Sequence, residues 1–229
     1  MSRADLWSKR LANAATQRRT SGGWRQRPIL DEGDTYIDFA GNDYLGLAKD
    51  PRMAEAQAEG AKRFGAGAKA SHLVSGHLAI HERLEHRLAE LTGRPRALLF
   101  STGYMANLGV LSTVAGPGDT ILLDSDSHAC IYDGCRLSGA TMIRFRHNDG
   151  EVLEKRSRRL GAERTGNLVI VVEGVYSMLG DRAPLREIVE VKKRHGAILV
   201  VDEAHSLGVF GDRGRGLAEE VGVLGDIDF

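Results

Sequence analysis

The residues best suited to chemistry follow the apolar run at 197–201, in the stretch AILVVDEAHSLGVFG. Asp202 comes directly after this run, where burying a carboxylate is costly unless a cation or a hydrogen-bond donor meets it. The letters DEAH also occur in helicases, where the cation is magnesium. A helicase needs an upstream phosphate loop of the form G-x-x-x-x-G-K-[ST], and the sequence has none. We therefore expect Asp202 and His205 to serve a different ligand.

Small residues follow another apolar run, at 97–100. Ser101, Thr102 and Gly103 form a tight turn, and the chain is predicted to be helical from Met105 onward. Free backbone N–H groups at a helix start attract anions, and glycine lets a phosphate come close to the backbone. The turn therefore fits an anion site, although an ordinary strand-to-helix turn has the same composition.

Two more apolar runs are followed by polar residues. His128 follows the run at 120–124, where an imidazole could stack on a flat ring or transfer a proton. Glu173 comes directly after the five apolar residues at 168–172, and Ser177 comes shortly after it. Both could hydrogen-bond a ligand. A loop histidine without a role and a simple strand-end cap are the alternatives.

The elements that would position these residues alternate along the chain. Short apolar runs, alternating with helical segments, predict strands buried on both faces of a mostly parallel sheet, hence an α/β fold with helices on both faces. The predicted strands cover 97–100, 120–124, 140–145, 168–174 and 197–203. Ligands of such sheets bind at the carboxyl ends of strands. Amphipathic or helical spacing predicts helices near the N-terminus, at 51–65 and at 78–93, with Gly65 and Gly93 as C-caps.

Composition excludes several classes of function. Lys+Arg and Asp+Glu number 31 each, so no basic excess indicates nucleic-acid binding. No apolar run approaches the roughly 18 residues of a membrane span. The N-terminus lacks the apolar centre of a secretory signal. Cys130 and Cys135 form only a lone C-x4-C, so we expect buried or idle thiols in a reducing cytoplasm. The HERLEH stretch misses metalloprotease spacing by one residue and is predicted to be a solvated helix face.

Six motifs together resemble those of the α-oxoamine synthases, which are pyridoxal 5′-phosphate (PLP) enzymes of fold type I. They are NDYLGL, GAKASHLVSGH, FSTGYMANLG, DSDSHA, EGVYSMLGDRAPL and VDEAHSLGVFGDRGRG, and they run in family order. Each is weak alone, but the set is highly specific. The resemblance implies a PLP-binding large domain at 46–229, incomplete and without the small domain, after an N-terminal segment at 1–45.

The same resemblance implies a role for each candidate residue. Gly103 and Tyr104 would bind the cofactor phosphate through backbone N–H groups, and His128 would stack on the pyridine ring. Asp202 would keep the ring nitrogen protonated, so that the ring can accept electrons. Ser177 and His205 would hydrogen-bond near the ring hydroxyl. Asn42 and Arg25 would contact the substrate. His128 and His205 are the residues expected to be catalytic.

One family feature is missing from the chain. The Schiff-base lysine of the family stands in a T-[FL]-[SG]-K segment, and no lysine here has that context. We therefore expect this chain to be the N-terminal portion of the enzyme and to lack significant synthase activity by itself.

The family joins an amino acid to an acyl thioester, carried by coenzyme A or acyl carrier protein, with loss of carbon dioxide. The first hundred residues favour L-alanine and a pimeloyl thioester, as in biotin synthesis. The later half resembles equally the members that use L-serine and a long acyl thioester in sphingolipid synthesis. A non-catalytic subunit is a rival, although such subunits usually relax the cofactor residues retained here. We expect a cytoplasmic enzyme that is a homodimer when full length.

Overall fold

A computed structural model describes residues 3–30, 37–161 and 164–229, and the chain divides into two compact units. The first unit, Met1–Gly41, contains helix α1 at Arg3–Thr20. This confirms the predicted N-terminal helix, none of whose residues is buried. The second unit, Asn42–Phe229, contains every other element named below.

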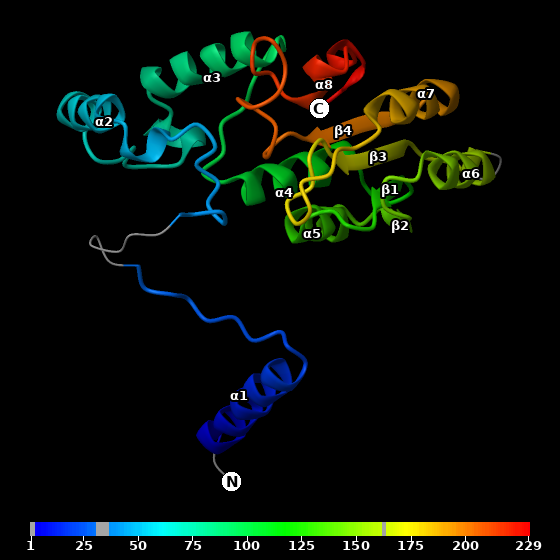
Figure 1. The fold of residues 1–229 in the computed structure, drawn as a ribbon, viewed down its shortest axis with the longest axis horizontal. Coiled ribbons are helices and arrows are strands. Elements are labelled where there is room, and N and C mark those ends of the chain that lie inside the picture. Colours follow the sequence, from blue (N-terminus) through cyan, green and yellow to red (C-terminus); the bar gives the residue numbers. More distant parts are fainter. Residues whose placement is uncertain (1–2, 31–36, 162–163) are drawn as a thin grey trace. The chain divides into compact units, whose positions relative to one another are not determined.

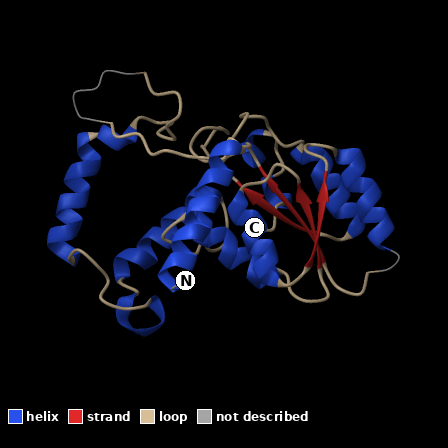
Figure 2. Ribbon diagram, turned by 90° about the horizontal axis from the view of Figure 1, so that it is seen from below, coloured by secondary structure: helices blue, strands red, loops and turns tan. Residues whose placement is uncertain are grey.

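A four-stranded parallel sheet forms the centre of the second unit, with strand order β2-β1-β3-β4 (Figures 1 and 2). The strands are β1 at Thr120–Asp124, β2 at Thr141–Phe145, β3 at Leu168–Glu173 and β4 at Ile198–Asp202. Four of the five predicted strands are thus confirmed. In the register of β3 and β4, Glu173 lies opposite Asp202, so two neighbouring strands end in carboxylates.

The structure has no strand at 97–100, contrary to the prediction. This segment is irregular, and Leu98 keeps 71% of its surface exposed. The Leu99 N–H donates to the Glu85 carboxylate at 2.9 Å instead of joining a strand ladder. A short apolar run becomes a strand only where a neighbouring strand completes its hydrogen bonds, and no described strand lies alongside.

Seven α-helices of the second unit are described: α2 at Pro51–Phe64, α3 at Ala79–Thr92, α4 at Gly103–Val114, α5 at Ala129–Ser138, α6 at Gly150–Gly161, α7 at Leu185–His195 and α8 at Leu217–Glu220. Single turns of 3-10 or π helix occur at Leu47–Lys49, His72–Gly76 and Leu224–Asp226. The predicted C-caps of α2 and α3 are confirmed, and both glycines have positive φ. Among the described residues, we find no helix with the length and apolarity that a bilayer crossing requires.

Two apolar cores sandwich the sheet, because successive strand residues point to opposite faces. On one face, Leu122, Ile170 and Leu199 pack with residues of α6 and α7. On the other face, Ile121 and Val200 pack with residues of α4 and α5. Both faces are therefore covered by helices, as the buried strands predict. This arrangement brings the N-termini of α4 and α5 toward the carboxyl edge of the sheet.

Candidate functional site

A cavity of about 430 Å³ opens at the carboxyl ends of β3 and β4. Its walls come from the segment at 42–47, the first turns of α4 and α5, the ends of β3 and β4, and the loop at 204–209. All of these segments belong to the second unit. The cavity therefore lies where the parallel sheet predicts a ligand site.

Asp202 is held in the cavity wall by donors from two segments. Its Oδ2 accepts a hydrogen bond from Asn107 Nδ2 at 2.7 Å, and its Oδ1 accepts one from the Ala204 N–H at 2.9 Å. These contacts supply part of the compensation that a carboxylate at this position needs. Sequence reasoning did not identify Asn107. A usable signal was present, because it lies one helical turn after Gly103 and shares its helix face.

His128 is the N-cap of α5, and its Nδ1 accepts the Cys130 N–H at 3.2 Å. The Cys130 thiol lies 2.9 Å from the same nitrogen, and Asn107 Nδ2 donates to its sulfur at 3.2 Å. Burial raises the pKa of the Cys130 thiol, more than the bond from Asn107 lowers it. Cys130 is thus a neutral thiol in the cavity wall, and its burial agrees with the sequence prediction.

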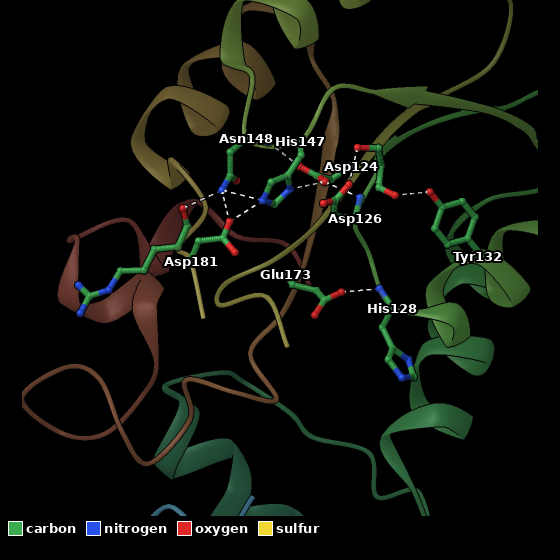
Figure 3. A network of polar contacts seen from close by, with 10 residues as sticks. Asp124, Asp126, His128, Tyr132, His147, Asn148, Glu173 and Asp181 are labelled. Atoms are coloured by element: carbon green, nitrogen blue, oxygen red, sulfur yellow. Dashed lines mark hydrogen bonds and ion pairs between the residues drawn. The ribbon is translucent and has the colours of Figure 1, made fainter. Parts of the chain in front are cut away.

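Glu173 supports His128 from the sheet side. The His128 backbone N–H donates to Glu173 Oε1 at 2.5 Å (Figure 3). The carboxyl is only 3% exposed, and this burial raises its pKa to about 7, with the nearby Asp202 charge adding to the effect. The bond from His128 opposes the rise. Near neutral pH the protonated and ionised forms of this group are therefore both populated.

The N-terminus of α4 forms another part of the wall, at Gly103 and Tyr104. Thr102 caps the helix by accepting the Met105 N–H at 3.1 Å. The first N–H groups of an α-helix have no partner within the helix, so they are available to an anion. The Tyr104 side chain is committed elsewhere, since its hydroxyl donates to Asp133 of α5, which raises the tyrosine pKa. We therefore expect Tyr104 to contact a ligand through its backbone N–H and not through its hydroxyl.

His205 and Asn42 meet through a residue that the sequence analysis missed. The Tyr44 hydroxyl lies 2.6 Å from His205 Nδ1 and 3.2 Å from Asn42 Oδ1. The three residues all line the cavity, although 161 positions separate Tyr44 from His205. The NDYLGL motif and the DEAHS motif therefore form one wall.

Two predicted site residues are not brought to this cavity by the described contacts. Ser177 is exposed and is not among the lining residues. Arg25 lies in the first unit. The roles of both residues stay predictions. None of the lining residues in the described part of the chain is a lysine.

The parallel sheet covered on both faces, with a cavity at its carboxyl edge, matches the fold of PLP-dependent transferases. Residues 34–224 match the model of the aminotransferase class I and II family, and the chain belongs to this family.

The chain is 60% identical over 215 residues to the 8-amino-7-oxononanoate synthase of Chromohalobacter salexigens. This alignment covers 94% of this chain and 55% of that relative. It is 52% identical over 198 residues to the serine palmitoyltransferase of Caulobacter vibrioides, covering 86% of this chain and 49% of that one.

Among solved structures, a serine palmitoyltransferase variant from S. paucimobilis with bound PLP superposes with a TM-score of 0.87 and 41% identity. The superposition covers all of this chain and 61% of the chain in that structure. The chain therefore spans about half the length of the curated relatives it matches. The resemblance to α-oxoamine synthases, drawn from the six motifs, is confirmed by these relatives.

Proposed function

We propose that this chain binds PLP in the cavity and forms the cofactor-binding part of an α-oxoamine synthase. The observation that carries the proposal is the anchored carboxylate of Asp202, which faces a cavity that also contains His128 and the start of α4. A cationic ring nitrogen, a flat ring and a phosphate need these three groups. The donor set of the cavity therefore fits the cofactor.

The residues of the chain have distinct tasks in this proposal. The backbone N–H groups of Gly103 and Tyr104 hold the phosphate, and the His128 imidazole covers the ring. Asp202 holds a proton on the ring nitrogen, while Asn107 keeps the carboxylate oriented. His205, positioned by Tyr44, and Ser177 hydrogen-bond near the ring hydroxyl. When bound, PLP supplies a conjugated electron acceptor for the substrate Cα.

We propose a decarboxylative condensation of L-alanine with a pimeloyl thioester as the activity of a protein carrying this chain together with the remaining half of the fold. The 60% identity to an 8-amino-7-oxononanoate synthase supports these substrates. This condensation would be a step of biotin biosynthesis. Asn42 and Arg25 would contact substrate, and coenzyme A or acyl carrier protein would carry the acyl group. As for other family members, we place the enzyme in the cytoplasm as a homodimer.

Serine palmitoyltransferase is the second candidate, favoured by the 52% identity to the Caulobacter enzyme and by the structural match. A product assay separates the two candidates, if it uses a protein that contains this chain together with the remaining half of the fold. Mass spectrometry should detect 8-amino-7-oxononanoate from L-alanine and pimeloyl thioester. A long-chain product from L-serine and palmitoyl thioester, with none from alanine, would replace the first candidate by the second. If neither product forms although PLP is bound, the result would favour a non-catalytic subunit.

The cavity as described lacks a lysine amine that could bond covalently to PLP. We therefore propose that residues 1–229 alone bind the cofactor reversibly and do not turn over. Titration with PLP, followed by the absorbance of the cofactor and by equilibrium dialysis, should show saturable binding of one cofactor per chain. Borohydride treatment followed by dialysis should leave no stoichiometric label. A reducible stoichiometric band accompanied by turnover would contradict this proposal.

A further inference from the structure

His147, which follows β2, bridges two carboxylates from different parts of the sheet edge (Figure 3). Its Nδ1 lies 2.8 Å from Asp124 Oδ1, and its Nε2 lies 2.5 Å from Asp181 Oδ2. Asn148 Nδ2 also lies 3.2 Å from Nε2. Ionised carboxylates only accept hydrogen bonds, so to bond both carboxylates the two ring nitrogens must each donate. That is possible only for the imidazolium form. None of these residues takes part in the proposed cofactor contacts.

The surroundings of His147 retain its proton. The Asp124 side chain is 1% exposed and the His147 side chain is 21% exposed, so solvent screens this ion pair little. Tyr176 closes one side, with its ring perpendicular to the imidazole at 4.4 Å between centroids. Asp126 and Glu173 also lie close to the ring. Burial alone would lower the pKa of His147, but the hydrogen bonds to Asp124 and Asp181 outweigh it and raise that pKa.

Each aspartate bound by His147 helps to order a loop at the rim of the sheet, Asp124 through its carboxylate and Asp181 through its backbone. Asp124 accepts the Asp126 N–H at 2.9 Å with Oδ1, and the Asn148 N–H at 2.9 Å with Oδ2. The loop organised in this way, residues 125–128, ends at His128. On the other side, the backbone carbonyl of Asp181 accepts the Tyr176 N–H at 2.9 Å. That bond closes the loop at 176–181, which contains Ser177.

We propose that His147, as an imidazolium, is a positioning residue that ties the loop ending at His128 to the loop containing Ser177. The inference rests on the proposed function, because it concerns the placement of residues expected to hold the cofactor. If the ring loses its proton, one nitrogen becomes an acceptor facing a carboxylate. One of the two aspartates then loses its hydrogen bond to His147 and keeps only the bonds from Asn148 and the loop backbone, so its loop is held less firmly.

The pH dependence of loop order and of PLP affinity has a defined direction, because His147 acts in its protonated form. A histidine whose pKa is raised by folding contributes its full effect below its unfolded pKa, and the contribution is lost as pH rises through the folded pKa. Loop order and PLP affinity should therefore decline as pH rises from neutral into the alkaline range. Neutral replacements of His147 should remove this dependence.

The test compares wild-type residues 1–229 with His147→Gln. Amide hydrogen exchange, corrected for intrinsic rates and measured without ligand, should show about tenfold less protection of Asp126 and Asn148 in the variant. The dissociation constant of PLP, measured from pH 6 to 9, should be about tenfold higher in the variant at pH 6, and the rise with pH expected of the wild type should be lost. His195→Gln is the matched control, since His195 pairs with Glu154 at 3.0 Å but does not line the cavity.

The possible results separate this proposal from the proposed function. A wild-type chain that binds no PLP would defeat the proposed function, and the exchange data would still judge His147. Equal protection and equal pH dependence in wild type and variant would overturn the positioning role. So would unchanged PLP affinity in a variant whose loops have loosened.

A second approach serves if His147→Gln does not fold. An NMR titration of the wild-type imidazole should place its midpoint above 6.5, the ordinary value for histidine, and Asp181→Asn should move the midpoint down. That second variant should also expose the amides of 176–181 while leaving Asp126 protected. A His147 ring that is neutral at pH 7 would overturn the proposal.

Discussion

At the scale of single residues, the charge of Asp202 is the feature on which cofactor binding depends. Asp202→Asn keeps the shape of the side chain but removes the negative charge that would meet a protonated ring nitrogen. Loss of a charge-assisted hydrogen bond should weaken PLP binding by about 10- to 100-fold, measured by equilibrium dialysis. Asp212→Asn, an exposed change outside the cavity, should leave the affinity as it is. Equal affinities in the two variants would contradict the proposed role of Asp202.

Glu173 predicts a second effect at this scale, on stability. Its pKa is raised by burial to about 7 from an ordinary 4.5, so the folded state binds more protons than the unfolded state between these values. Stability from this group is present below about pH 4.5 and is lost as pH rises to about 7. Glu173→Gln, which keeps an acceptor for His128, should gain relative to wild type as pH rises, by on the order of 3 kcal/mol. Urea unfolding at several pH values measures the difference, and Glu55→Gln on exposed α2 should show none.

At the scale of elements, the site depends on how closely α4 and α5 approach each other. A Cβ at Gly134 of α5 would lie 2.9 Å from the Asn107 carbonyl oxygen and 3.0 Å from Leu111 Cδ1. Gly134→Ala should therefore push the helices apart, cost about 1–3 kcal/mol of unfolding free energy and weaken PLP binding, because both helices begin at the cavity.

Gly60 of α2 provides the matched control for this prediction. An added Cβ there has nothing within 4 Å, so Gly60→Ala should stabilise the protein by about 0.5–1 kcal/mol. Chemical denaturation of both variants gives the comparison. A Gly134→Ala protein that is as stable as Gly60→Ala would show that the close contact between α4 and α5 is not required.

At the scale of the whole molecule, cofactor binding should stabilise the folded chain by mass action. At a PLP concentration 100 times the dissociation constant, the free energy of unfolding should rise by about 2.7 kcal/mol, measured by urea denaturation. Pyridoxal without the phosphate, at the same concentration, should stabilise much less because it leaves the N-terminus of α4 without an anion. Equal stabilisation by the two compounds would contradict the phosphate role of Gly103 and Tyr104.

Local pattern was enough to predict α1, the helices α2 and α3 with their glycine caps, a helix that includes Met105, and the four strands of the sheet. It also indicated that polar residues following those strands would meet, because parallel strands bring their carboxyl ends to one edge. Gly103, His128 and Asp202 line a common cavity for that reason. The exception at 97–100 arises because strand formation depends on a neighbour, which an apolar run does not specify.

The sequence by itself determined the elements and the set of motifs that placed the chain in its family, since both depend on residues close together along the chain. Only the tertiary structure decided the pairings: Asn107 with Asp202 across 95 positions, Glu173 with the His128 backbone across 45, and His147 between Asp124 and Asp181. These contacts depend on how helices and loops pack across the sheet edge, which local periodicity does not encode.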